Sequence, residues 1–248
     1  MGELLNNKVC IVTGSVRGIG KEIALLFASE GAEVVVNGPR PGSADQWIKE
    51  SVQREHLHSY YFNISDSTSV RQNIMAIKKK FGRIDVLVNN AGVEFNELIG
   101  MISRENMEKM FHVNVYGVIE MIQAVSRIMS RNKNGGSIIN ISSMVGLHGN
   151  AGQLVYSATK GAVIAITKSA AKELAPKGIR VNSIAPGLTQ TEMMEQADTK
   201  KLQERISHIC MGRIAQPKDI ASGCLLLASD YAGYISGQVL PVDGCTIM

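Results

Sequence analysis

The sequence has few of the features that mark several large classes of protein. Aromatic residues make up only 5% of the chain, the formal net charge is +4, and the only basic run is Lys78-Lys79-Lys80. A nucleic-acid-binding surface usually has a broad basic face with aromatic side chains among the cations, so we expect no nucleic-acid partner. We interpret the lysine run as favourable charge at a helix C-terminus.

Cysteine is also scarce. None of the four cysteines belongs to a C-x-x-C pair or lies near a histidine cluster; they are Cys10, Cys210, Cys224 and Cys245. This usage indicates a reducing compartment and no metal site. No apolar run reaches the roughly 18 residues of a membrane span, and the polar N-terminus lacks a signal-peptide pattern. We therefore expect a cytoplasmic protein without membrane contact.

Short β-branched runs alternate with longer helical patterns along the whole chain. The predicted strands are Val9–Thr13, Glu33–Asn37, Ser59–Asn63, Val86–Asn89, Ser137–Ser142, Arg180–Ile184 and Gln238–Val242. The predicted helices are Ile19–Ser29, Ala44–Arg54, Ser67–Phe81, Arg104–Ser130, Gly152–Ala175 and Pro217–Ala228. No linker or repeat interrupts them. The pattern predicts an α/β protein: residues 1–248 form a single doubly wound Rossmann domain, a seven-stranded parallel sheet with helices on both faces.

A glycine cluster lies at the first strand–helix junction. Gly14 permits a tight turn, Gly18 lets the backbone approach a pyrophosphate, and Gly20 lets the helix pack against the strand. The free N–H groups of the helix N-terminus then face the phosphates. A flexible loop is the alternative, but the position of the cluster favours a nucleotide site that also includes Ser15, Arg17 and Ile19.

The second predicted strand indicates which nucleotide binds. It ends in Asn37-Gly38-Pro39-Arg40, without the acidic residue that usually binds the ribose 2′-hydroxyl of NAD. Arg17 and Arg40 can both approach the 2′ position, where a guanidinium suits a phosphate. We therefore favour NADP(H) over NAD(H); the alternative is that both arginines are simply solvated.

Tyr156 and Lys160 are spaced to share one face of a helix. A nearby ammonium lowers the pKa of a tyrosine, which can then exchange a proton with a carbonyl oxygen as hydride moves. A surface pair is the alternative when this spacing stands alone. Here a predicted strand ends in Ser142-Ser143, shortly before Tyr156.

Together these motifs resemble the short-chain dehydrogenase/reductase family over nearly the whole chain. The segment Thr13-Gly14-x-x-x-Gly18-Ile19-Gly20 resembles its T-G-x-x-x-G-I-G motif, and Ser143 stands thirteen residues before Tyr156, the family's serine–tyrosine spacing. The resemblance implies that Ser143 holds the substrate oxygen, Tyr156 is the acid/base and Lys160 also binds the nicotinamide ribose. Asn114 would support a water relay to the lysine.

The resemblance also implies further cofactor contacts. They fall on Asn63 and Ile64, on Asn90, Ala91 and Gly92 of an N-N-A-G motif, and on Pro186, Gly187, Thr189 and Thr191 after a P-G motif. Asn63 departs from the usual aspartate.

Within the family, the segments around Gly149–Tyr156, Lys172–Asn182 and Gly237–Gly244 most resemble 3-oxoacyl-(acyl-carrier-protein) reductases. The resemblance implies reduction of a carrier-bound 3-oxoacyl thioester in fatty acid biosynthesis by a homotetramer, assembled through its two long helices and its last strand. A dehydrogenase of a small alcohol, sugar or secondary metabolite remains open, because Glu94 and Cys245 depart from the reductase pattern. The loop from Gly187 to Ile209 shapes the substrate pocket, and its sequence does not indicate which substrate binds. Arg131, Lys133 and Lys177 could form a basic rim for an acidic carrier protein, or be ordinary surface cations.

Overall fold

The computed structural model describes residues 3–190 and 199–247. Seven parallel strands form one sheet in the order β3-β2-β1-β4-β5-β6-β7. The strands are β1 (Val9–Val12), β2 (Glu33–Gly38), β3 (Leu57–Tyr61), β4 (Val86–Asn89), β5 (Gly136–Ile141), β6 (Ile179–Pro186) and β7 (Val239–Val242). This arrangement confirms the predicted seven-stranded, doubly wound parallel sheet. The order reverses between β1 and β4, and ligands of such folds bind outside the carboxyl ends of the strands at that point.

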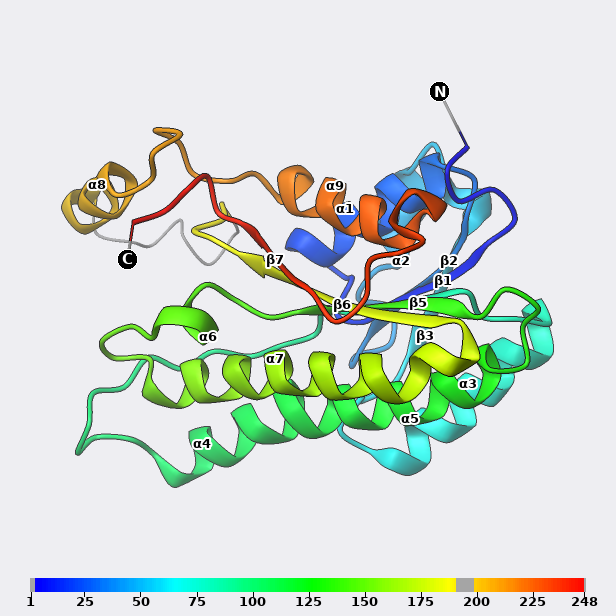
Figure 1. Cartoon of the computed structure of the whole chain (residues 1–248), viewed down its shortest axis with the longest axis horizontal. Coiled ribbons are helices and arrows are strands. Elements are labelled where there is room, and N and C mark those ends of the chain that lie inside the picture. The colour runs from blue at the N-terminus through cyan, green and yellow to red at the C-terminus, as the bar shows by residue number, and fades with distance from the viewer. Residues whose placement is uncertain (1–2, 191–198, 248) are drawn as a thin grey trace.

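Helices cover both faces of the sheet (Figure 1). They are α1 (Gly18–Ser29), α2 (Asp45–Glu50), α3 (Ser67–Phe81), α4 (Arg104–Phe111), α5 (Gly117–Met129), α6 (Val145–His148), α7 (Leu154–Leu174), α8 (Thr199–Ser207) and α9 (Pro217–Ala228). The central strands are almost wholly apolar because both of their faces are buried.

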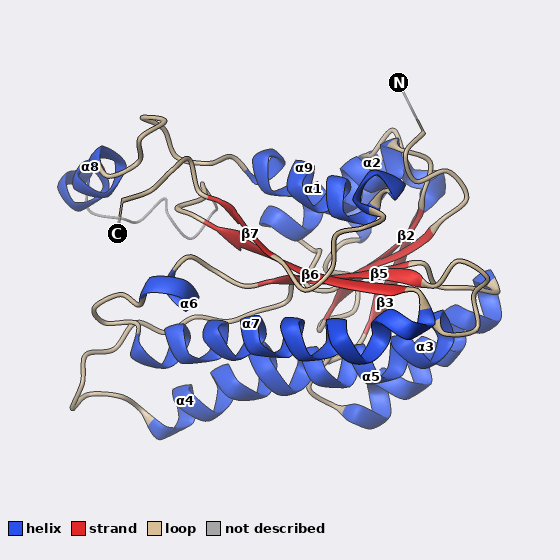
Figure 2. Cartoon of the chain, viewed as in Figure 1, coloured by secondary structure: helices blue, strands red, loops and turns tan. Residues whose placement is uncertain are grey.

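The hydrophobic core is divided into two layers by the sheet. One layer packs α1 and α9 against the strands, with the fully buried Phe27 and Ile220 among its residues. The other packs α3, α5 and α7 on the opposite face, with Ile74, Met121 and Val163. Figure 2 shows these helices above and below the sheet, which is seen nearly edge-on. No helix in the described residues is long and apolar enough to cross a membrane.

Several predicted boundaries differ from the structure. The third strand lies two residues earlier than predicted, because Asn63 begins a turn in which its side chain accepts from Ser65 N at 3.0 Å. The helix predicted over 44–54 ends at Glu50 and is followed by a short 3-10 turn, η1 (Arg54–His56). The helix predicted over 104–130 is interrupted by a π-helical turn, η2 (His112–Tyr116). The short helices α6 and α8 were not predicted.

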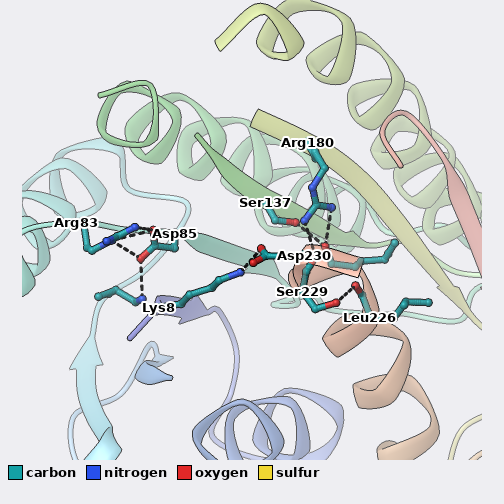
Figure 3. A network of polar contacts seen from close by, with 10 residues as sticks. Lys8, Arg83, Asp85, Ser137, Arg180, Leu226, Ser229 and Asp230 are labelled. Carbon is teal, nitrogen blue, oxygen red and sulfur yellow. Dashed lines mark hydrogen bonds and ion pairs between the residues drawn. The ribbon is translucent and has the colours of Figure 1, made fainter. Parts of the chain in front are cut away.

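Charged side chains tie together the amino edge of the sheet (Figure 3). Asp85, just before β4, accepts from Val9 N at 2.9 Å and forms a two-pronged ion pair with Arg83. Arg180 of β6 donates to the carbonyls of Leu227 and Ser229, at the end of α9. These contacts join the sheet to the α9 layer at the edge opposite the carboxyl ends of the strands.

Candidate active site

Ser143, Tyr156 and Lys160 come together at the carboxyl edge of the sheet. Ser143 follows β5, while Tyr156 and Lys160 lie in the first two turns of α7. Ser143 is near enough to the Tyr156 hydroxyl to act on its pKa, and the Lys160 ammonium lies 5.6 Å from the centre of the Tyr156 ring. The geometry therefore brings together the three residues that the sequence selects for catalysis.

The two adjacent serines have different environments. The Ser142 hydroxyl is buried, donates to Ile184 O at 2.9 Å and accepts from Ser183 at 2.8 Å, so it joins β5 to β6. Ser143 is only half-buried and lies on the tyrosine side. Of the two, Ser143 is thus the hydroxyl placed to contact a substrate oxygen.

The direction of the Tyr156 pKa shift corrects a sequence-based expectation. Burial raises the pKa of the Tyr156 hydroxyl above its ordinary value, and the negative charge of Glu94 raises it further. Ser143 acts on this pKa in the other direction but is outweighed. We expected the Lys160 ammonium to hold this pKa down; instead, the loss of solvation of the phenolate dominates.

Lys160 is buried, with 4% of its surface exposed, and its ammonium donates to Ile141 O at 2.8 Å. Burial lowers the pKa of this lysine from 10.5 to about 8, although the Glu94 charge opposes the shift. Nζ also lies about 3.5 Å from where a Cβ on Gly92 would stand, while Asn114 Oδ1 lies 3.3 Å from the same point. A glycine at position 92 therefore keeps space open beside the lysine.

Asn114 lies in the π-helical turn η2 and is 1% exposed. Its Oδ1 accepts from Val93 N at 2.8 Å, and its Nδ2 donates to Val93 O and to Thr159 Oγ1. Thr159 in turn donates to Tyr156 O at 2.8 Å. The asparagine therefore fixes the loop after the N-N-A-G motif against the first turn of α7. The π turn is the local distortion that accommodates it.

Glu94 joins this site, although the sequence identified it only as a departure from the family pattern. Its carboxylate accepts a short hydrogen bond from Gln153, which in turn accepts from Asn150 at 2.7 Å. Its charge acts on both Tyr156 and Lys160. The signal in the sequence was a charged residue directly after the N-N-A-G-V segment, where the carboxyl edge of β4 would place it.

The glycine loop has the form that a phosphate group requires. Gly14 has a φ of 61°, and a Cβ there would come within 2.7 Å of Ala91 Cα. A Cβ on Gly20 would lie 2.4 Å from Asn90 Nδ2, so only glycine lets α1 pack this closely. At its N-terminus α1 has no side-chain cap and no acidic residue in its first turn. Its N–H groups are therefore positioned to bind an anion.

Two residues predicted to touch the cofactor, Ser15 and Asn90, also use their side chains to shape this loop. The buried Ser15 hydroxyl donates to Val12 O at 2.7 Å and accepts from Asn37 N. The Asn90 amide donates to the carbonyls of Thr13 and Gly14 at 2.9 and 3.0 Å. Any cofactor contact from these residues would come from their backbones; Ala91 N is itself bonded to Thr13 Oγ1.

The end of β2 has no room for an acidic side chain. A Cβ on Gly38 would lie 2.4 Å from Val16 Cγ1 and 3.2 Å from Ser43 Oγ. Arg17, at the N-cap of α1, and Arg40, just after β2, are both exposed. Both arginines therefore lie on segments that border the glycine loop, and no carboxylate replaces Gly38.

The remaining residues that we predicted to contact the cofactor have different environments. Ile64 is buried against Gly117, and the exposed Asn63 belongs to the turn after β3. Pro186 ends β6, while Gly187 packs so closely on Asp243 that a Cβ would come within 2.7 Å of its Cα. The Thr189 hydroxyl donates to Gly187 O at 3.0 Å. Ile19 lies in the first turn of α1, and Thr191 lies outside the described residues.

The proposed basic rim does not flank this site in its own chain. Arg131, Lys133 and Lys177 are exposed, but they precede β5 and β6 and thus lie at the amino edge of the sheet. Ser143, Tyr156 and Lys160 lie at the opposite edge. As for metals, no group of histidine, cysteine and acidic residues within 3–190 and 199–247 could hold an ion.

Comparison with known proteins places this geometry in context. A family model described as enoyl-(acyl carrier protein) reductase matches residues 14–245. The chain is similar to the 3-oxoacyl-[acyl-carrier-protein] reductase of Thermotoga maritima, with 41% identity over 241 residues covering 97% of this chain and 98% of that one. It is also similar to the 3alpha-hydroxysteroid dehydrogenase of Mediterraneibacter gnavus, with 39% identity over 244 residues and 97% of each chain covered. The 3-oxoacyl-[acyl-carrier-protein] reductase of Chlamydia trachomatis is 39% identical over 247 residues, 98% of this chain and 99% of that one.

Proposed function

The chain belongs to the short-chain dehydrogenase/reductase family, and from this premise we propose that it uses NADPH to reduce the ketone of a 3-oxoacyl thioester to a secondary alcohol. As a member it is an NAD(P)-dependent oxidoreductase acting on CH–OH groups. The observation that carries the proposal is the position of Ser143 after β5 and of Tyr156 and Lys160 at the start of α7, in a chain 41% identical to a 3-oxoacyl-[acyl-carrier-protein] reductase.

The residues present fit a nicotinamide nucleotide. The uncapped N-terminus of α1 suits the pyrophosphate, and the space kept open at Gly92 lies beside Lys160 and Asn114. Gly14, Gly18 and Gly20 shape the loop, while Lys160 would hold the nicotinamide ribose. When bound, this cofactor supplies the hydride that the reaction needs.

The chain's own residues then bind and protonate the substrate oxygen. Ser143 donates a hydrogen bond to the carbonyl and holds it near Tyr156, as a donor that stabilises developing negative charge. Tyr156 gives its proton to that oxygen as the alkoxide forms. Its raised pKa keeps it protonated across the neutral range, which suits reduction. Asn114 holds the backbone of Val93 against the helix, so that Lys160 stays beside the tyrosine.

The choice of NADPH rests on the end of β2. The steric contact of a Cβ at Gly38 with Val16 disfavours a carboxylate there, while Arg17 and Arg40 are exposed on the two bordering segments. A guanidinium binds a 2′-phosphate in a forked geometry, and no acid is present to repel it.

A second candidate is the oxidation of a ring or chain secondary alcohol. The 39% identical 3alpha-hydroxysteroid dehydrogenase and the Glu94 carboxylate beside Tyr156 favour it. The Glu94 charge acts on both Tyr156 and Lys160, and a neutral substrate hydroxyl could bond to this carboxylate.

We also propose that the protein acts as a homotetramer and accepts its substrate from an acyl carrier protein. The outer faces of α5 and α7 carry a groove lined by Ile119, Ile122, Ile166 and Ala170, and Ile119 is exposed in the single chain. Light scattering on the purified protein tests the assembly.

A substrate and cofactor panel tests the function. Purified enzyme is assayed with a 3-oxoacyl thioester, an enoyl thioester and a 3α-hydroxysteroid, each with NADP(H) and NAD(H). We expect the highest kcat/KM for the 3-oxoacyl thioester with NADPH, and Arg40→Asp should weaken NADPH far more than NADH. A higher kcat/KM with the steroid or the enoyl thioester, or a tenfold preference of the wild type for NADH, would refute the corresponding part of the proposal.

A further inference from the structure

Two exposed cysteines lie on neighbouring backbone segments where the C-terminal tail runs beside the segment that follows α8. Ile209 and Thr246 form an antiparallel bridge. Next to it, Cys210 N donates to Cys245 O at 3.2 Å, and Met211 N donates to Gly244 O at 3.0 Å. Cys210 and Cys245 are therefore neighbours beside this isolated bridge. Figure 1 shows the C-terminal tail near α8. In the sequence, this tail is far from the end of β6.

Both cysteines of this pair are free and exposed. The Cys210 thiol is near enough to raise the pKa of the Cys245 thiol. A disulfide requires Cα atoms about 4.4–6.8 Å apart, and the backbone hydrogen bond of 3.2 Å between Cys210 N and Cys245 O brings the two residues close together.

The tail is held in this position by its own turn. Cys245 N donates to Asp243 Oδ1 at 3.1 Å, and Thr246 Oγ1 donates to Asp243 O. Asp243 itself packs on Gly187, at the start of the loop that shapes the substrate pocket. The pair thus lies where the tail, the end of that loop and the carboxyl edge of β6 meet.

We propose that Cys210 and Cys245 form a reversible disulfide by exchange with a low-molecular-weight disulfide of the glutathione class. In the first step one protein thiolate attacks a reagent sulfur; a protein–reagent S–S bond forms, the reagent S–S bond breaks, and one reagent thiol leaves. In the second step the other protein thiol loses its proton and displaces the second reagent thiol. Two protein thiols are oxidised, and one reagent disulfide is reduced to two thiols.

The other two cysteines provide an internal contrast. Cys10 and Cys224 are 0% exposed in the core, and burial raises the pKa of both thiols. The pKa of Cys245 is also raised, so exposure is what distinguishes the pair: a disulfide reagent cannot reach a thiol that has no exposed surface. Oxidation should therefore be confined to the Cys210–Cys245 pair.

The test follows the thiols directly. Wild type, Cys245→Gly and Cys224→Ala are equilibrated in glutathione buffers of increasing oxidised fraction, quenched with an alkylating reagent and weighed by mass spectrometry. Cys245→Gly is suited to this test because position 245 has a φ of 59°, where glycine is unstrained. Wild type and Cys224→Ala should lose two alkylatable thiols together and keep no glutathione. Cys245→Gly should instead keep one glutathione on Cys210.

A second readout measures the tether itself. Closing a long loop should raise the melting temperature of oxidised wild type by several degrees, and reductant should reverse the rise. The proposal is overturned if wild type keeps mixed disulfides, or stays reduced in a buffer that modifies Cys245→Gly. Disulfides between chains on a non-reducing gel, or an unchanged melting temperature after oxidation, would overturn it as well.

Discussion

At Tyr156, burial outweighs the cation that shares its helix face. An ammonium close to a tyrosine should lower its pKa, but Lys160 directs Nζ to Ile141 O and carries its own burial penalty. The phenol therefore stays protonated over the neutral range. Such a residue is poised to give a proton to a carbonyl oxygen, and taking one from an alcohol requires higher pH.

The first prediction concerns this proton. Tyr156→Phe keeps the ring but removes the hydroxyl, so kcat should fall by about 10²–10⁴-fold, the range of general acid–base catalysis. Ser143→Ala should cost on the order of 10²–10³, because one donor to the substrate oxygen is lost. Steady-state kinetics and nucleotide titration measure both effects, and nucleotide affinity should survive in Tyr156→Phe.

Ser142→Ala is the matched control, because the neighbouring hydroxyl bonds only to β6. It should lower stability and leave kcat nearly unchanged. If Tyr156→Phe keeps more than about a tenth of the wild-type kcat, another group supplies the proton.

The second prediction concerns Glu94, whose charge raises the pKa of Tyr156 and of Lys160. Glu94→Gln removes the charge while keeping an acceptor for Gln153. Both pKa values should fall, so alcohol oxidation should begin to rise at a lower pH than in the wild type. Profiles of kcat/KM against pH in the oxidative direction measure the shift.

Glu97→Gln is the control for a nearby carboxylate. Glu97 bonds to Ser103 N and Asn106 and is not among the charges that act on Tyr156. Its pH profile should match the wild type. Identical profiles for the two variants would mean that Glu94 has no electrostatic role.

Much of the site could be predicted from the sequence because the separations of Ser143, Tyr156 and Lys160 along the chain resemble those of the short-chain dehydrogenase/reductase family; the spacing of Tyr156 and Lys160 alone left a surface pair open. Electrostatics could not be predicted in the same way. The effect of Glu94 depends on how deeply Tyr156 and Lys160 are buried, which only the packed structure gives. Likewise, the sequence suggested cofactor contacts for Ser15 and Asn90, whose side chains the fold uses to shape the glycine loop.

At the scale of elements, the strong hydrophobic periodicity of the sequence was enough to predict the long helices and the central strands. The ranges of α3 and α9 and of β4 match the prediction at both ends. The π-helical turn at Asn114 was missed because a single extra residue in a helix hardly changes an apolar periodicity of 3.6. The third strand was placed too late because side-chain bonding in the Asn63 turn, and not hydrophobicity, ends it.

The third prediction belongs to the amino edge of the sheet. Asp85 is 7% exposed and receives bonds from Val9 N and Arg83. Asp85→Ala leaves a buried N–H without its acceptor, so the free energy of unfolding should fall by about 2–3 kcal/mol. Catalysis should be unaffected because the site lies at the opposite edge. Urea denaturation and steady-state kinetics test the two parts.

Asp230→Ala provides the comparison, because Asp230 also pairs with a cation at this edge, Lys8, but its side chain is 94% exposed. Exposed pairs contribute little, so this variant should unfold almost as the wild type does. Equal losses in the two variants would show that burial does not decide the strength of these contacts.

At the scale of the whole molecule, the two edges of the sheet have different roles. The amino edge is joined by paired charges, whereas the carboxyl edge contains a buried lysine that folding must desolvate. Burial lowers the pKa of Lys160 from 10.5 to about 8, so its charged form is disfavoured in the native state. Between these values the unfolded chain binds more protons than the folded one. Stability contributed by this group therefore rises with pH across that window and is lowest below about pH 8.

The fourth prediction follows from the direction of this pH dependence of stability. Lys160→Met removes the buried charge and keeps a side chain of similar length, so near pH 7 it should unfold with a free energy about 1–3 kcal/mol higher than the wild type. The same change should greatly lower kcat and nucleotide affinity. The stability gain should shrink as the pH rises from about 8 toward 10.5, because the wild-type lysine then loses its proton in the native state. Urea denaturation of both proteins at three pH values across the window measures this.

Lys168→Met, at an exposed position of α7, should show no such pH-dependent difference. If Lys160→Met is less stable than the wild type at all three pH values, the hydrogen bond from Lys160 to Ile141 O outweighs the cost of burying the charge. The lysine would then stabilise the fold.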